Sequence, residues 1–85
     1  MFFLLRPCRS SAAYEAIPKR DLRLDIDDVE AKLEDDYNIV LNAGIMLVLE
    51  RECEISIHKS GKIIIKTGSE EIARKEVERI YELLG

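Results

Sequence analysis

The chain has 85 residues and a formal net charge of −4 at pH 7; 47% of its residues are hydrophobic and 35% are charged. That length is enough for one domain with a small core, and it excludes a second domain. No apolar run approaches the roughly 20 residues of a membrane-spanning helix, so we expect a cytoplasmic protein without a membrane partner. The net charge argues against general attraction to polyanions, although it allows a locally basic surface.

The N-terminal segment has the least regular pattern. Its short apolar start, Phe2–Leu5, is followed by Pro7, so residues 1–11 are expected to be a disordered leader or an edge strand. Residues 12–85 are expected to form the single folded domain. Basic residues near this end could follow a nucleic-acid backbone or simply belong to the leader; they are Arg6, Arg9, Lys19 and Arg20.

A short helix is predicted next, ending near Asp35–Asp36. Asp25 or Asp27 can cap its first turn, where the helix dipole also favours acidic side chains. One apolar face follows from a three- and four-residue spacing, given by Ile26, Val29 and Leu33.

Two strands should follow this helix. Tyr37–Leu41 is rich in β-branched and aromatic residues, and a short Asn-Ala-Gly interruption at residues 42–44 separates it from the next run. Ile45–Leu49 is almost continuously apolar. Such a run is typical of a strand that is covered on both faces, or of one whose second face awaits a partner.

A β-hairpin is predicted around Lys59–Gly61, because Gly61 can supply the positive φ that a three-residue turn needs. This turn pairs His58 with Lys62, Ser56 with Ile64, and Glu54 with Lys66. The alternate positions form an apolar set that should face the core, namely Cys53, Ile55, Ile57, Ile63 and Ile65.

An amphipathic helix is predicted for the last part of the chain, with Ser69 or Thr67 as its N-cap. Its exposed face carries two possible ion pairs at i,i+4 spacing, Glu70–Arg74 and Glu71–Lys75. Its apolar face is formed by Ala73, Val77, Ile80 and Leu84, with Ile72 and Tyr81 beside them.

The sheet face turned away from the helices is the candidate site. Continuing the side-chain alternation across a Glu50–Glu52 turn places Ile45, Leu47 and Leu49 on that face, beside Ile64. Exposed apolar patches of this kind are uncommon on monomers and are often functional. We therefore expect something to cover this face.

Several motifs between residues 12 and 85 resemble one repeat of the TATA-box-binding protein fold. They are Ile45-Met46, the Ser60-Gly61-Lys62 turn, Thr67-Gly68, the Ser69-Glu70-Glu71 helix start, Leu24–Val29 and Tyr37-Asn38. The fold that we expect is α+β in the order β-α-β-β-β-β-α, with a curved antiparallel sheet and both helices on its convex face. In that family, two such repeats form a saddle that binds the minor groove of DNA.

The resemblance also assigns positions to DNA contacts. The positions that wedge between base steps correspond to Leu41 and His58, and a base-reading position corresponds to Ala13. Positions that hold phosphate-side arginines in the family correspond to Leu47 and Leu49.

Catalytic and metal-binding patterns are not found in the sequence. His58 is the single histidine and has no partner at ligand spacing, and Cys8 and Cys53 lack metal-ligand spacing. No Gly-rich phosphate loop, nucleophile–base pair or HExxH motif is found. We expect no enzyme activity, metal or cofactor.

The sequence therefore predicts a non-catalytic binding module. By resemblance its partner is DNA or another nucleic acid; the alternative is a protein-interaction or homo-oligomerisation module that uses the same face, with a homodimer expected. Lys59, Lys62 and Lys66 could bind phosphates or protect a strand edge. The candidate face consists of Leu41, Ile45, Leu47, Leu49, Ser56, His58, Lys62, Ile64 and Lys66.

Overall fold

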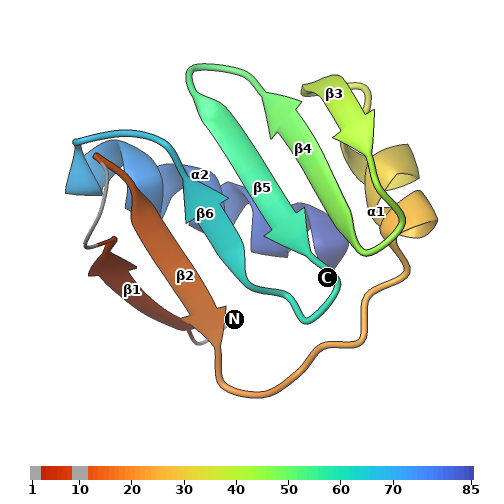
Figure 1. Ribbon diagram of the computed structural model, residues 1–85, viewed down its shortest axis with the longest axis horizontal. Helices are drawn as coiled ribbons and strands as arrows, with labels where there is room; N and C mark the ends of the chain where they lie inside the picture. The colour runs from red at the N-terminus through yellow and green to blue at the C-terminus, as the bar shows by residue number, and fades with distance from the viewer. Residues whose placement is uncertain (1–2, 9–11) are drawn as a thin grey trace.

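The structure, a computed structural model, describes residues 3–8 and 12–85. Within these ranges the chain forms one six-stranded antiparallel sheet and two helices (Figure 1), which confirms the α+β class. The strands lie in the order β1-β2-β6-β5-β4-β3. The elements are β1 (Phe3–Pro7), β2 (Tyr14–Pro18), α1 (Ile26–Leu33), β3 (Asn38–Asn42), β4 (Met46–Glu50), β5 (Glu54–His58), β6 (Ile63–Ile65) and α2 (Glu70–Leu84).

The expected element order is wrong at its start, because two strands precede α1 instead of one. Strand β1 pairs antiparallel with β2 along its whole length, from Phe3 opposite Pro18 to Pro7 opposite Tyr14. The Phe3 ring also lies 5.4 Å from the ring of Tyr81 on α2, measured between centroids. These contacts make Phe3–Pro7 an edge strand, while the remainder of the expected leader, residues 1–2 and 9–11, lies outside the described residues.

The β5–β6 hairpin has the predicted register. Ser56 lies opposite Ile64, and Gly61 has a φ of 99°, in the region that favours glycine. The N–H of Lys66 donates to the carbonyl of Glu54, which continues the pairing past the end of β6. The alternate aliphatic positions are fully buried; they are Ile55, Ile57, Ile63 and Ile65.

The predicted facing of β4 is wrong. Glu50 lies opposite Glu54, so Leu49 lies opposite Ile55 and Leu47 opposite Ile57. Both leucines are 0% exposed and belong to the core. The physical reason is the length of the connection: residues 51–53 form it, and a shift of one residue moves every side chain of a strand to the opposite face.

Helix α1 begins at the first of its two predicted caps. The Asp25 carboxylate accepts hydrogen bonds from the backbone N–H groups of Asp27 and Asp28, at 3.0 and 3.4 Å. The side-chain amide of Asn42 donates to Asp27 and to Glu30, at 2.9 Å each, and so ties the end of β3 to this helix. The predicted apolar face is buried, formed by Ile26, Val29 and Leu33.

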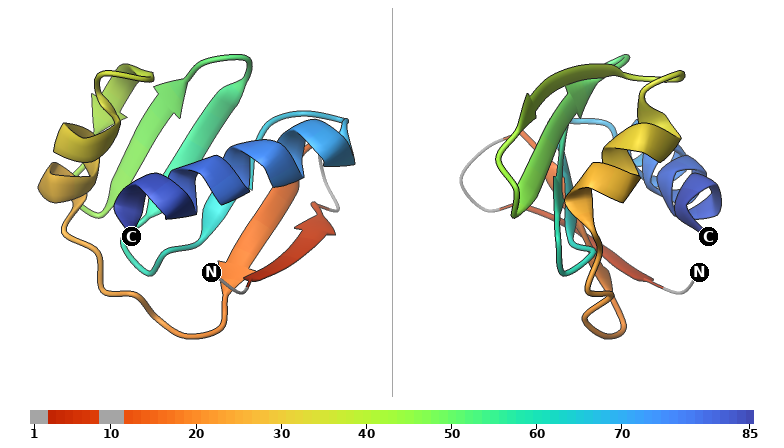
Figure 2. Two further views of the ribbon diagram at one scale, coloured as in Figure 1. Left: turned by 180° about the vertical axis from the view of Figure 1, so that it is seen from behind. Right: turned by 90° about the vertical axis from the view of Figure 1, so that its right-hand side faces the viewer.

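Helix α2 begins where the sequence predicts, since the Ser69 hydroxyl accepts a hydrogen bond from the N–H of Ile72 at 3.3 Å. Figure 2 shows it crossing the sheet on the same side as α1. The Tyr81 hydroxyl donates to the carbonyl of Gly61 at 2.6 Å, and burial raises the pKa of Tyr81 to about 12. The buried apolar residues of this helix are Ala73, Val77, Ile80 and Tyr81.

The two predicted ion pairs on α2 have different outcomes. Arg74 lies 4.0 Å from Glu70, but Glu71 and Lys75 do not form an ion pair in the described part of the chain. Such exposed pairs contribute little to stability. The helix is therefore held mainly by its buried face.

Replacement of Ile80 by alanine should lower the free energy of unfolding by about 2–5 kcal/mol, because Ile80 is fully buried and its truncation leaves a cavity. Urea unfolding followed by circular dichroism measures this. Glu78→Ala, on the exposed side of the same helix, is the control and should change little. Equal unfolding midpoints for Ile80→Ala and wild type would contradict the assigned helix face.

Candidate functional site

The sheet surface on the side away from the helices, which we call the outer face, faces the viewer in Figure 1. Its central row crosses all six strands, because each member lies directly opposite the next on the neighbouring strand. From β1 to β3 the central row is Arg6, Glu15, Ile64, Ser56, Val48 and Leu41.

Two further rows flank the central row. On one side Leu4 lies opposite Ile17 and Met46 opposite His58, whose N–H donates to the carbonyl of Lys62 at 2.8 Å. On the other side the row runs through Lys66, Glu54, Glu50 and Asn38. The outer face thus combines an aliphatic centre with charged side chains.

The aliphatic side chains of the outer face come from every strand except β5. Leu41 and Leu4, on the two edge strands, are 53% and 57% exposed. The others are partly buried by their neighbours; they are Ile17, Ile64, Met46 and Val48. Strand β5 contributes Ser56 in their midst, where a small side chain leaves the flanking aliphatics accessible.

The basic side chains of these rows are paired with carboxylates. Glu15 accepts from Arg6 Nε at 2.6 Å and lies 3.0 Å from Lys62 Nζ, while Lys66 Nζ lies 2.6 Å from Glu54. The hydrogen bonds from Arg6 and then from Lys62 lower the pKa of Glu15 below its ordinary value. These pairs neutralise the positive charge that a nucleic acid would seek.

The structure brings together six of the nine predicted site residues. Leu41, Ser56, His58, Lys62, Ile64 and Lys66 lie in the three rows. Ile45 precedes β4 at the turn and is 60% exposed, whereas Leu47 and Leu49 lie in the core and are removed from the site.

Sequence reasoning missed eight residues of the outer face: Leu4, Arg6, Glu15, Ile17, Asn38, Met46, Val48 and Glu50. The observed turn of three residues at positions 51–53 would have predicted Met46, Val48 and Glu50. The members from β1 and β2 depend on the pairing of these two strands, and Asn38 depends on the pairing of β3 with β4.

His58 has a structural role in the hairpin turn. The N–H of Ser60 donates to His58 Nδ1 at 3.0 Å, and the Ser60 hydroxyl lies 2.9 Å from the same nitrogen. Within residues 3–8 and 12–85, no group of three or more His, Cys, Asp or Glu residues is arranged to hold a metal ion. In the same ranges, neither helix has the length and apolar character needed to cross a bilayer.

Comparison with protein-family models, with curated proteins and with solved structures finds no match to this chain. Its function has to be argued from the geometry and chemistry of its own surfaces.

Replacement of Glu15 by glutamine should lower stability at neutral pH by about 1 kcal/mol, because it removes the carboxylate shared by Arg6 and Lys62. The folded-state pKa of Glu15 is below the ordinary 4.5, so its contribution is present above that value. It is lost as the pH falls through the lowered pKa. Urea unfolding of both proteins over a pH series measures the difference, with Glu78→Gln as the control. A difference that does not change with pH would contradict the assigned ion pairs.

Proposed function

We propose that this chain is a non-catalytic binding module whose outer face joins a second copy of the chain in a homodimer. The observation that carries this proposal is an aliphatic sheet face, uncovered by any described element, whose basic side chains are already paired with carboxylates.

The aliphatic centre supports association through apolar contact. Leu4 and Leu41 are more than half exposed, and Ile17, Ile64, Met46 and Val48 lie between them. Two sheets that pack face to face interdigitate side chains of this kind at about 10 Å separation, as in a β-sandwich. Dimerisation removes this apolar surface from water.

The charge pattern of the outer face supports a partner of the same kind. Its rows hold three basic side chains and three carboxylates, so the face is neutral apart from His58. The basic residues Arg6, Lys62 and Lys66 lie toward β1 and β6, whereas Glu50 and Glu54 lie on β4 and β5. A two-fold axis parallel to the strands places the β1–β2 half of one copy over the β3–β4 half of the other. Opposite charges and aliphatic side chains then meet across the interface.

The edge of strand β2 is occupied by β1, which leaves the outer face as the contact surface of the proposed homodimer. Strand β1 covers the edge of β2, and β1 and β3 are the remaining edges of the described sheet. A second copy therefore cannot pair with the edge of β2, and the proposal rests on contact between outer faces.

Nucleic-acid binding is the second candidate function, because Lys62, Lys66 and His58 lie on the same face as Leu41. It rests on the resemblance to one repeat of the TATA-box-binding protein fold, which remains a prediction, as does a curved sheet with its helices on the convex face. Phosphates would have to displace Glu15 and Glu54 from these lysines. This displacement weakens the attraction between basic side chains and phosphates, which dominates nucleic-acid affinity.

Val48→Asp should convert a dimer into a folded monomer, because Val48 lies at the centre of the outer face and outside the buried core. An unpaired carboxylate there would be buried at an apolar contact. Light scattering over a range of concentrations should give twice 9.8 kDa for wild type and 9.8 kDa for the variant. Ala31→Asp, on the exposed surface of α1, is the matched control and should leave the mass unchanged. A wild-type mass of 9.8 kDa at the highest concentration would rule out the homodimer.

Wild type is expected to show no salt-dependent binding to duplex DNA, single-stranded DNA or RNA in fluorescence anisotropy titrations. The reason is the pairing of Lys62 and Lys66 with carboxylates. Binding that weakens with salt, and whose salt slope falls by about two phosphate contacts in the Lys62→Glu/Lys66→Glu variant, would favour the nucleic-acid function. Salt-dependent binding that is unchanged in that variant would place nucleic-acid binding on another surface of the chain.

A further inference from the structure

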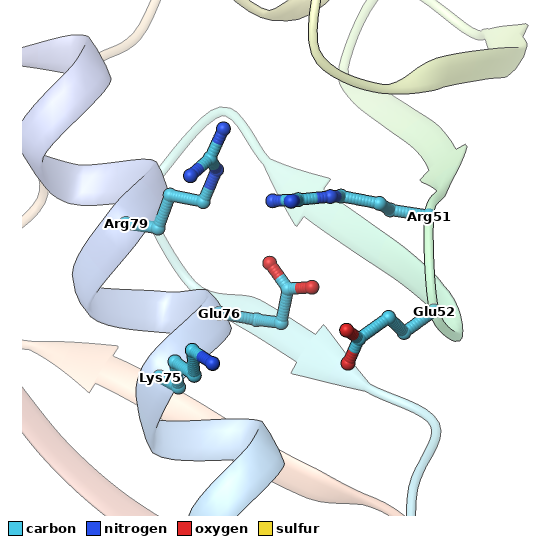
Figure 3. A pocket seen from close by; sticks show the side chains of 5 residues that line it. All are labelled: Arg51, Glu52, Lys75, Glu76 and Arg79. Atoms are coloured by element: carbon cyan, nitrogen blue, oxygen red, sulfur yellow. The ribbon is translucent and has the colours of Figure 1, made fainter.

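A second candidate site lies between the β4–β5 turn and helix α2. It is a cavity of about 130 Å³ lined entirely by charged residues, and we call it the charged cavity (Figure 3). The turn contributes Arg51 and Glu52, and the helix contributes Lys75, Glu76 and Arg79. In Figure 3 the guanidinium group of Arg51 points across the cavity toward Arg79, and the Glu76 carboxylate lies below the Arg51 guanidinium.

Glu76 is the fixed element of the charged cavity. It is 4% exposed, and its Oε1 accepts a hydrogen bond from the hydroxyl of Tyr37 at 2.7 Å. Burial and then this hydrogen bond raise the pKa of Tyr37 well above its ordinary value, so the hydroxyl remains a donor. The Arg51 guanidinium carbon lies 5.8 Å from the centre of the Tyr37 ring, which orients Arg51 toward the cavity.

The basic groups of the charged cavity offer more donors than the protein supplies acceptors. Arg79 Nε is buried and has no hydrogen-bond partner among the described residues, although Nη2 of the same side chain lies 3.4 Å from Asp36. In the described part of the chain, neither Arg51 nor Lys75 has a carboxylate within the 4.0 Å of an ion pair. A buried N–H without an acceptor is unfavourable, and each guanidinium carries five N–H donors.

We propose that the charged cavity binds a small tetrahedral oxyanion between the guanidinium groups of Arg51 and Arg79, with Lys75 beside it. Such an ion supplies acceptors in several directions, including one for the buried Nε, and guanidinium groups match its geometry. Three basic residues against two carboxylates in the lining favour an anion over a cation. The volume admits a phosphate or sulfate group rather than a large ligand.

This inference does not depend on the proposed homodimer. The charged cavity belongs to α2 and the β4–β5 turn, whereas the outer face lies on the opposite side of the sheet (Figures 1 and 2). Failure of either proposal leaves the other standing.

The test is a titration of the full chain with inorganic phosphate at constant ionic strength, followed by amide chemical shifts in two-dimensional NMR. Saturable shifts are expected in residues 51–53 and 75–79. Arg51→Gln should weaken binding roughly 10–100-fold, as expected for losing hydrogen bonds to a charged group. Because Arg51 is exposed and has no ion pair in the described residues, this variant should keep the fold. Lys75 is also exposed and has no ion pair in the described residues, so Lys75→Gln should likewise keep the fold and weaken phosphate binding.

Arg74→Gln is the matched control, since Arg74 lies next to Lys75 on α2 but pairs with Glu70 outside the cavity. Equal weakening in Arg74→Gln, or shifts that do not saturate, would mean adventitious ion binding only and would overturn the proposal. Acetate binding more tightly than phosphate and sulfate would overturn the tetrahedral geometry. Glycerol phosphate binding more tightly than inorganic phosphate would support the site and identify a phosphorylated small molecule as its ligand; the reverse order would support the site and identify the free ion.

Discussion

The register of the β4–β5–β6 meander is the constraint on which the rest of the structure depends. Side chains alternate between the two faces of a strand, so the pairing of Glu50 with Glu54 decides the facing of every residue in β4. In the observed register, Leu47 and Leu49 join the aliphatic residues of β5 and β6 in one buried core with the helices. A shift by one residue would expose both leucines and turn Glu50 toward the core, where an unpaired carboxylate is strongly unfavourable.

The same register determines what the outer face can offer a partner. Met46 and Val48 replace the leucines there, and β5 places Ser56 between them and Ile64. Strand β1 then adds Arg6 to the carboxylate of Glu15, which Lys62 also contacts. Because these charges are already compensated within the chain, apolar contact is the interaction that remains for association. The proposed second copy would cover the aliphatic centre and place opposite charges together at the margins.

Two faces of helix α2 have different roles. Its inner stripe, which includes Val77 and Ile80, fills the core against the sheet. On its flank, Glu76 binds Tyr37, and Arg79 reaches Asp36 while its Nε has no partner among the described residues. A single element therefore anchors the fold and supplies most of the charged cavity. The cavity and the outer face are separated by the sheet, so they can act independently.

The sequence alone determined those elements whose pattern lies within one continuous stretch of the chain. Both helices and the β5–β6 hairpin follow from periodicity, capping and a positive φ at Gly61, while the structure selects Asp25 and Ser69 from the alternative caps. Five of the nine predicted site residues follow from the hairpin pattern, whereas Leu41 was assigned by the family resemblance. Tertiary structure alone decided the facing of β4, because one residue more in the turn at 51–53 reverses it and no local sequence pattern distinguishes the two turns. It also decided the pairing of β1 with β2, which no local pattern indicates, and the contact of Glu15 with Lys62 and the charged cavity, which join segments far apart in the chain. Their stability comes from burial and charge compensation, which exist only after the core has brought those segments together.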